Sequence, residues 1–179
     1  FKPHSIVLVD QGETPLHQLT LELETIVTES NIHSVIADVR NKEVMRRVFK
    51  TYSPQVVYHA AAYKHVPLME ENPSQAIQTN VEGTKNVADL ACEFKVKKFV
   101  MVSTDKAVNP SNVMGASKRI AEKYVQSLQL RSVKENNGKG TKFITTRFGN
   151  VLGSNGSVVP LFSKQIAAGG PVTITHQDI

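Results

Sequence analysis

Short, continuously apolar runs alternate along this chain with longer segments in which apolar residues recur at helical spacing. The apolar runs predict strands at residues 5–10, 33–39, 55–62, 97–104 and 142–148. The helical patterns predict helices at residues 14–29, 42–52, 73–94 and 113–130, with a further helix beginning at Val158. Strands that are apolar throughout are typical of a parallel sheet buried on both faces. The alternation therefore predicts an α/β domain with a doubly wound parallel sheet and helices on both faces.

The longest of these helices has a recognisable start. Pro73 suits the first helical position, and Asn72 before it is a residue type that caps helices with its side chain. We therefore expect one continuous helix from Pro73 to Phe94, capped by Asn72.

Composition narrows the class of protein. The chain has 179 residues, 40% of them hydrophobic, and a net charge of +5. Its lysines are dispersed without a basic run, which argues against nucleic-acid binding. With Cys92 as the only cysteine, neither a disulfide nor a cysteine metal site is expected, and we predict no metal. No run approaches roughly 18 apolar residues, so no membrane segment is predicted in this chain. We expect a cytoplasmic protein, or the cytoplasmic part of a membrane-anchored one.

One expected feature of a Rossmann-like dinucleotide-binding fold is missing from the start of the chain. In that fold the first strand ends in a glycine-rich turn, and an acid closing the second strand binds the ribose. Asp10 closes the first apolar run here and suits the role of that acid, although it could equally be a strand-end turn residue. We therefore expect the first strand and its glycine turn to lie before this chain, leaving a gap in the sheet. The spacing of Gly149, Gly153 and Gly156 resembles that of a phosphate-binding loop, but we interpret these glycines as part of a loop that shapes the substrate pocket.

Three segments, 59–87, 102–119 and 147–162, carry a family resemblance. In them the chain resembles the nucleotide-sugar 4,6-dehydratases of the extended short-chain dehydrogenase superfamily, in the branch used for capsule and O-antigen biosynthesis. The resemblance implies a UDP-N-acetylglucosamine-like substrate, a tightly held NAD or NADP, and a 4-keto-6-deoxy product. It also implies a homodimer or a higher homo-oligomer formed through the helices at 73–94 and 113–130.

The resemblance assigns catalytic roles to one strand end and the helix after it. Thr104 would orient the 4-hydroxyl, Asp105 would be the acid for water loss, and Lys106 the base at C5. Lys118 would bind the nicotinamide ribose. Met114 stands where the superfamily normally has its catalytic tyrosine, and a thioether does not titrate. We expect the base to be relocated and the enzyme to be slow but active.

Other residues are carried over from the same resemblance as binding residues. The expected cofactor contacts are Asp10, Asp38, Val39, Ala60, Ala61, Ala62, Asn80 and Lys118. The expected substrate contacts are Lys64, Asn150, Val151 and Ser157, so that residues 149–179 begin the substrate-binding part after a partial cofactor domain. A carboxylate at position 10 would repel the 2′-phosphate of NADP and favour NAD.

Two other functions stay open. A nucleotide-sugar 4-epimerase or reductase on the same fold needs no acid at C6, so Asp105 and Lys106 would have no purpose in it, and it normally depends on the tyrosine that Met114 replaces. A non-catalytic dimerising module would explain a chain without a glycine loop.

Overall fold

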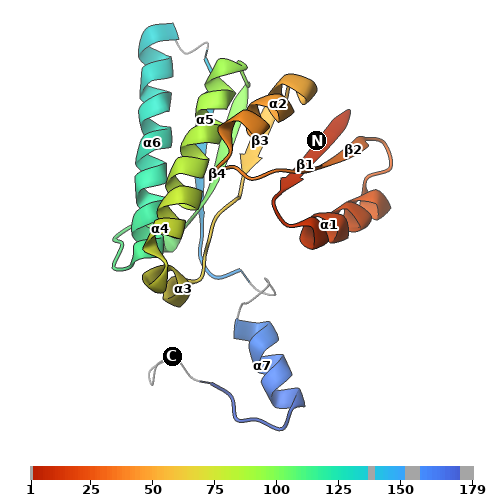
Figure 1. The fold of residues 1–179 in the computed structure, drawn as a ribbon, viewed down its shortest axis with the longest axis vertical. Helices are drawn as coiled ribbons and strands as arrows, with labels where there is room; N and C mark the ends of the chain where they lie inside the picture. Colours follow the sequence, from red (N-terminus) through yellow and green to blue (C-terminus); the bar gives the residue numbers. More distant parts are fainter. Residues whose placement is uncertain (1, 137–139, 152–157, 174–179) are drawn as a thin grey trace. The chain divides into compact units, whose positions relative to one another are not determined.

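The fold is described from a computed structural model, which covers residues 2–136, 140–151 and 158–173. Strands and helices alternate along the chain (Figure 1). The strands are β1 (Ser5–Asp10), β2 (Asn31–Ile36), β3 (Val56–His59), β4 (Lys98–Thr104) and β5 (Lys142–Phe148). The helical elements are α1 (Glu13–Ile26), α2 (Lys42–Tyr52), α3 (Val66–Glu71), α4 (Pro73–Ala76), η1 (Ile77–Gly83), α5 (Thr84–Glu93), η2 (Asp105–Ala107), α6 (Val113–Asn136) and α7 (Val158–Ala167). Contacts divide the chain into two compact units, residues 1–147 and 148–179.

The strands of the first unit form two separate sheets. Strands β1 and β2 pair in parallel, from Ser5 opposite Asn31 to Asp10 opposite Ile36. Strand β3 pairs in parallel with β4, which lies between β3 and β5 in a three-stranded sheet. Among the described strands no pairing joins the two sheets. This division agrees with the gap that the sequence predicts next to the first two strands.

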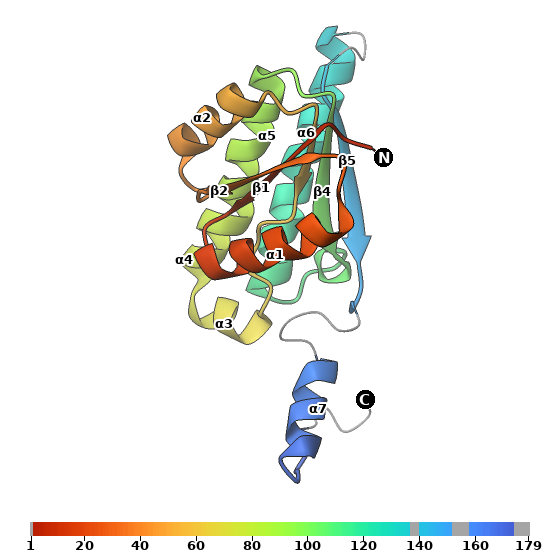
Figure 2. The same cartoon turned by 90° about the vertical axis from the view of Figure 1, so that its right-hand side faces the viewer.

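The main core lies where α5 and α6 cover one face of the three-stranded sheet (Figures 1 and 2). Phe99 near the start of β4 is completely buried, and its ring lies 5.4 Å from Phe143 of β5 and 5.8 Å from His59 of β3. Alternation along the strands turns every second side chain away from these helices. On that opposite face Val56, Tyr58 and Ile144 are exposed.

The long helix expected at 73–94 is interrupted by a different helical form. It consists of α4, the π-helix η1 and α5 in succession. Asn72 is the N-cap residue of α4, as expected, but its side chain makes no capping hydrogen bond. Its amide instead donates to the carbonyl of Leu68, 2.9 Å away. Leu68 belongs to α3, a short helix that the sequence analysis missed.

Several predicted boundaries also shift. Strand β3 ends at His59 instead of residue 62, and β2 spans 31–36 instead of 33–39. Just past the predicted end of β3, the backbone N–H and C=O of Tyr63 are both bonded to the Asn80 side chain. Helix α6 extends to Asn136, beyond the predicted residue 130.

The second unit contains α7. The Gln165 side chain holds the segment after this helix, donating to the Thr173 hydroxyl at 2.7 Å and accepting from the Thr173 N–H at 3.1 Å. Nowhere in the described ranges does a helix have the length and apolar character needed to cross a membrane.

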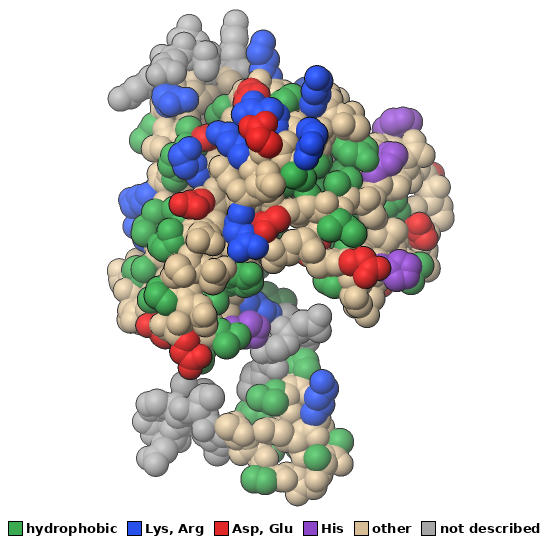
Figure 3. Space-filling model, viewed as in Figure 1, with side chains coloured by type: hydrophobic (Ala, Val, Ile, Leu, Met, Phe, Trp, Pro, Cys, Tyr) green, Lys and Arg blue, Asp and Glu red, His purple; other side chains and the backbone are tan. Residues whose placement is uncertain are grey.

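Charges of both signs are mixed over the surface. In the view of Figure 3, lysine and arginine side chains are interspersed with acidic ones over the helices. Several of them are paired, as in Arg46 with Glu93 and Lys85 with Asp89. This mixture agrees with the dispersed lysines in the sequence.

Candidate active site

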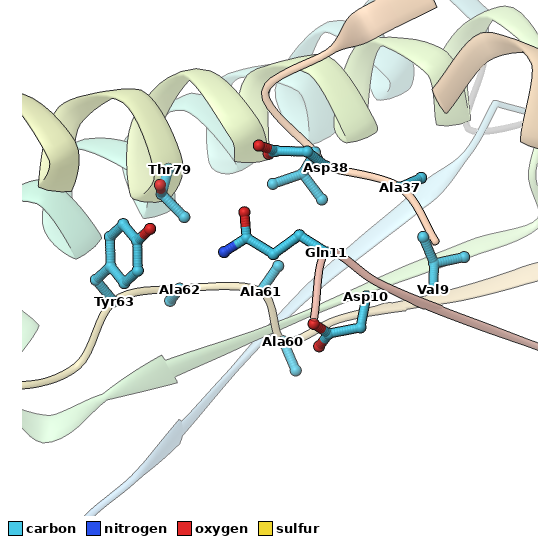
Figure 4. Close-up of a pocket in the computed structure, with 11 residues that line it drawn as sticks. Val9, Asp10, Gln11, Ala37, Asp38, Ala60, Ala61, Ala62, Tyr63 and Thr79 are labelled. Atoms are coloured by element: carbon cyan, nitrogen blue, oxygen red, sulfur yellow. The ribbon is translucent and has the colours of Figure 1, made fainter. Parts of the chain in front are cut away.

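A pocket of about 180 Å³ lies at the carboxyl ends of β1, β2 and β3 (Figure 4). It is lined by the last two residues of β1, by residues that follow the three strands, and by one residue of η1: Val9, Asp10, Gln11, Ala37, Asp38, Val39, Ala60, Ala61, Ala62, Tyr63 and Thr79. The carboxyl ends of parallel strands are where open α/β sheets bind their ligands. The structure thus brings together six residues that the sequence predicted as cofactor contacts, namely Asp10, Asp38, Val39 and Ala60–62.

The two pocket carboxylates are held in different ways. Asp10 accepts a hydrogen bond from the Gly12 N–H at 2.7 Å. A Cβ at Gly12 would lie 2.8 Å from Pro15, so a side chain there would disturb this turn. Asp38 accepts from the Arg40 guanidinium at 2.7 Å, and this hydrogen bond lowers the pKa of Asp38 despite its partial burial.

Thr79 is a pocket residue that the sequence analysis missed. Its side chain is buried, it lines the pocket, and its hydroxyl has no hydrogen-bond partner within the described part of the chain. Figure 4 places it between Tyr63 and Gln11. An unpaired buried hydroxyl costs free energy, so this one is suited to bind a polar group of a ligand. A lone threonine in a helical pattern carries no sequence signal for that role.

Asn80, predicted as a cofactor contact, is fully buried and is not among the residues that line the pocket. Its side chain accepts from the Tyr63 N–H at 2.8 Å and donates to the Tyr63 carbonyl at 3.1 Å. It also donates to the Ser117 hydroxyl at 2.9 Å. Asn80 therefore links the pocket residue Tyr63 to Ser117 of α6 by hydrogen bonds. It lies in the π-helix, a form often found at functional sites.

The predicted catalytic residues form a compact turn at the end of β4. The Thr104 hydroxyl donates to the Asp105 carboxylate at 2.9 Å, and Lys106 Nζ donates to the same oxygen at 3.2 Å. Thr104 also accepts from the Lys106 N–H at 3.3 Å. The hydrogen bonds from Thr104 and then Lys106 lower the pKa of Asp105. This carboxylate is therefore ionised at rest.

Lys118 reaches the same strand end from α6. Its side chain is buried, and Nζ donates to the Val102 carbonyl at 2.7 Å. Burial lowers the pKa of Lys118 to about 8, although the carboxylate of Glu122 acts in the opposite direction. Nearby His59 is buried and its ring is hydrogen-bonded to Thr84; burial, and then the charge of Lys118, lower its pKa to about 3.

Met114 is buried in a small apolar cluster with Met69 and Ala76, against which Tyr63, Val66 and Val113 pack. Its position explains why a thioether is tolerated there, because the surrounding side chains are apolar or aromatic. Met114 fills space and has no titratable group to offer.

The predicted substrate contacts are scattered in the chain. Lys64 follows the pocket residue Tyr63, whereas Asn150 and Val151 belong to the second unit. Ser157 lies outside the described residues, as do Gly153 and Gly156 of the predicted substrate-pocket loop. These assignments stay predictions.

Together, the parallel strands and the pocket at their carboxyl ends define a Rossmann-like α/β domain. A family model described as "Polysaccharide biosynthesis protein" matches residues 1–179, and the chain belongs to this family.

Curated relatives agree with this assignment. "Capsular polysaccharide biosynthesis protein CapD" of Staphylococcus aureus is 55% identical over 180 residues, which cover 100% of this chain and 29% of the relative. A "UDP-N-acetylglucosamine 4,6-dehydratase (inverting)" of Campylobacter jejuni is 41% identical over 98% of this chain and 51% of the relative. A "UDP-glucose 4-epimerase" of Rickettsia canadensis is 42% identical over 87% of this chain and 44% of the relative. The chain spans about half the length of the dehydratase and less than half the length of the other two relatives.

Solved structures give the same fold. The structure of Pen from Bacillus thuringiensis superposes with a TM-score of 0.80 at 36% identity, covering 92% of this chain and 48% of that one. UDP-glucose 4-epimerase from Thermus thermophilus in complex with NAD gives a TM-score of 0.71 at 24% identity, covering 93% of this chain and 64% of that one. At this identity the second likeness shows the fold alone.

Proposed function

We propose that this chain carries the cofactor pocket and the acid–base residues of an NAD(P)-dependent 4,6-dehydratase acting on a UDP-N-acetylhexosamine, in the synthesis of a surface polysaccharide. The observation that carries the proposal is the turn at the end of β4, in which Thr104, Asp105 and Lys106 are joined by hydrogen bonds. The name and identity of the Campylobacter jejuni relative support the substrate class.

The pocket residues fit the nucleoside part of the cofactor. Three alanines leave room for a close approach, Asp10 at the pocket edge would accept hydrogen bonds from ribose hydroxyls, and the unpaired hydroxyl of Thr79 would bind a polar group of the ligand. A carboxylate at Asp10 favours NAD over NADP, because it repels a 2′-phosphate. When bound, NAD(P)+ supplies a hydride acceptor for C4 of the sugar and later a hydride donor for C6.

The resting hydrogen bonds suggest how two protons are moved without the tyrosine. Asp105 is ionised and accepts from Thr104, so it can take the proton of the 4-hydroxyl through the Thr104 hydroxyl. Once protonated, the same carboxyl group gives this proton to the departing 6-hydroxyl, which leaves as water. Lys106, which is paired with Asp105 as an ammonium at rest, first gives one proton to solvent; its neutral amine then takes the C5 proton, returns it to C5 after the elimination, and regains a proton from solvent. Each group thus ends the cycle in the protonation state in which it began.

In this proton-transfer scheme Met114 takes no part in the chemistry. The residue closes an apolar cluster and accepts no proton, so Met114→Leu is expected to keep kcat within roughly threefold. Removal of the acid in Asp105→Asn or of the base in Lys106→Met is expected to lower kcat by roughly 10²–10⁴-fold. The measurement is the rate of water loss from UDP-N-acetylglucosamine, followed by mass spectrometry.

A 4-epimerase is the second candidate, because the Rickettsia canadensis relative is as similar as the dehydratase. Epimerisation keeps the 6-hydroxyl, and so gives no chemical task to an acid and a base paired at one strand end. Both reactions begin from a UDP-sugar, and the products differ by one water.

The proposal is tested by incubating UDP-N-acetylglucosamine and NAD+ with this chain and with a form extended at both ends to the length of the dehydratase relatives. Loss of one water from the sugar nucleotide by either form would support a dehydratase. Conversion to the 4-epimer at unchanged mass would support the epimerase. Cofactor binding without any sugar conversion would favour the non-catalytic module.

A further inference from the structure

At Gly115, helix α6 presents no side chain of its own to the backbone of the turn at Lys106. At Gly115 an added Cβ would lie 2.4 Å from the carbonyl oxygen of Lys106 and 3.2 Å from its carbonyl carbon. The first of these separations is roughly 1 Å shorter than an ordinary contact. Because the neighbour is backbone, it cannot turn aside as a flexible side chain could. The backbone of the turn therefore rests directly on the bare Cα of Gly115.

Gly115 is itself fixed in place. Its N–H donates to the Asn112 side chain at 2.8 Å, and the Asn112 carbonyl accepts from the Ala116 N–H at 2.9 Å. These bonds form the first turn of α6. One helical turn further on, Lys118 bonds the carbonyl of Val102 in β4. The same helix thus contacts both the strand and the turn that follows it.

The turn is held at Lys106 from both sides. The Thr104 hydroxyl accepts from the Lys106 N–H at 3.3 Å, and Gly115 stands against the Lys106 carbonyl. Ala107, the next residue, is completely buried. By contrast, the Lys106 side chain is 40% exposed, and that of Asp105 is 56% exposed. Fixed backbone and accessible side-chain ends are the combination that an acid–base pair needs.

We propose that Gly115 is a positioning residue, whose missing side chain sets the distance between α6 and the turn that carries Asp105 and Lys106. This inference rests on the proposed function, because it assigns these two residues to the chemistry. A displacement of about 1 Å at a catalytic group can lower the rate about 10²-fold. Gly115 touches neither sugar nor cofactor in this proposal and acts through Lys106 alone.

The chain provides a matched control in Gly83. A Cβ at Gly83 would also be crowded, at 2.6 Å from Cγ2 of Val39, but that atom is a side chain lining the pocket. Both glycines are buried and helical, so alanine adds one methyl group in either place. Gly115→Ala is expected to lower kcat about 10²-fold with KM for the UDP-sugar within roughly threefold. Gly83→Ala is expected to raise KM for NAD instead and to keep kcat at saturating NAD.

A second measurement does not depend on activity. In ¹H–¹⁵N spectra of the chain, Gly115→Ala is expected to shift the amide signals of Asp105, Lys106 and Ala107, whereas Gly83→Ala shifts those around Val39. If the wild type loses no water from the sugar, the proposed function fails, and the spectra alone decide on Gly115. Unmoved signals at 105–107 would overturn the inference, as would an active enzyme whose kcat is unchanged by Gly115→Ala.

Should Gly115→Ala fail to fold, Asn112→Ala takes its place. This variant removes the cap on the Gly115 N–H without adding an atom, so the first turn of α6 is loosened. A fall in kcat of at least about threefold at unchanged KM would support the inference. A kcat equal to that of the wild type would overturn it.

Discussion

Lys118 keeps a titratable amine in a buried position. Its Nζ bonds to the Val102 carbonyl, and burial lowers its pKa from 10.5 to about 8. A buried amine of this kind can bind a polar ligand group, but its pKa of about 8 lies near physiological pH, whereas an ordinary lysine loses its proton at a much higher pH. Its protonation therefore affects stability as well as binding.

The effect of Lys118 on stability has a definite sign. Between pH 8 and pH 10.5 the unfolded chain keeps the proton that the folded chain has released, so the free energy of unfolding rises with pH in this window. We expect a gain of roughly 3 kcal/mol relative to Lys118→Met. Urea denaturation of both proteins from pH 7 to pH 11 measures it. Parallel pH curves would contradict the assignment.

At the residue scale, the sequence predicted residues at the strand ends that line the pocket, but neither the helix residue Thr79 nor the role of its neighbour Asn80 against residues 60–63. Asp10, Asp38 and the three alanines follow strand ends, and the topology alone places such residues at one edge of a sheet. Thr79 and the role of Asn80 were not predictable in this way, because both depend on which side of a helix meets residues 60–63. That contact joins distant parts of the chain and leaves no local pattern.

Helix α6 is the element that joins the site to the rest of the first unit. Glu122 is completely buried on it and accepts two hydrogen bonds from Arg147 of β5, at 2.8 and 2.7 Å. Arg119 donates to the same carboxylate at 3.2 Å. Burial alone would raise the pKa of Glu122, but the hydrogen bonds, chiefly from Arg147, lower it to about 2. The carboxylate stays ionised and links α6 to β5.

Removal of the Glu122 charge should weaken the contact between α6 and β5. Glu122→Gln leaves two arginines without their carboxylate, and we expect Tm at pH 7 to fall by roughly 5–10 °C. The difference should shrink as pH falls from 4.5 towards 2, where Glu122 itself becomes protonated. Differential scanning calorimetry at several pH values measures both effects. The exposed Glu82→Gln serves as the control, and equal Tm changes in the two variants would refute the role of Glu122.

The elements themselves were largely predictable, because apolar periodicity follows from burial. The starts of β1, α2, β5 and α7 agree with the sequence analysis. The π-helix was missed, although the step from Val81 to Val87 breaks the three-to-four spacing of the other apolar residues in that segment. Helix α3 was missed because six residues are too few for a periodic pattern.

At the scale of the whole molecule, helix α6 carries several exposed apolar side chains. Ile120, Leu130 and Val133 on α6 are each about half or more exposed, at 49%, 64% and 51%. Exposed apolar side chains on one helix favour association with another copy. We propose that α6 takes part in a homodimer, together with the helices at 73–94.

Charges on this surface should prevent such association. The double variant Ile120→Lys and Leu130→Lys is expected to raise the dimer dissociation constant at least about tenfold, because burying an unpaired lysine is costly. Sedimentation equilibrium over a range of concentrations measures the constant. Ile26→Lys on α1 is the matched control, since Ile26 is 75% exposed. A monomeric wild-type chain, or an equal effect of the control, would contradict the proposal.

The division of the strands into two sheets has a consequence for how the first unit opens. Strands β1 and β2 share no ladder with β3 among the described residues, so their amides can lose protection from hydrogen exchange independently of the three-stranded sheet. The pocket, however, is lined from the ends of β1, β2 and β3 together. A nucleotide bound there would bridge the two sheets and couple their opening. The cofactor would then connect the two sheets. Its binding would be detectable as slower amide hydrogen exchange in β2, independently of any chemical reaction.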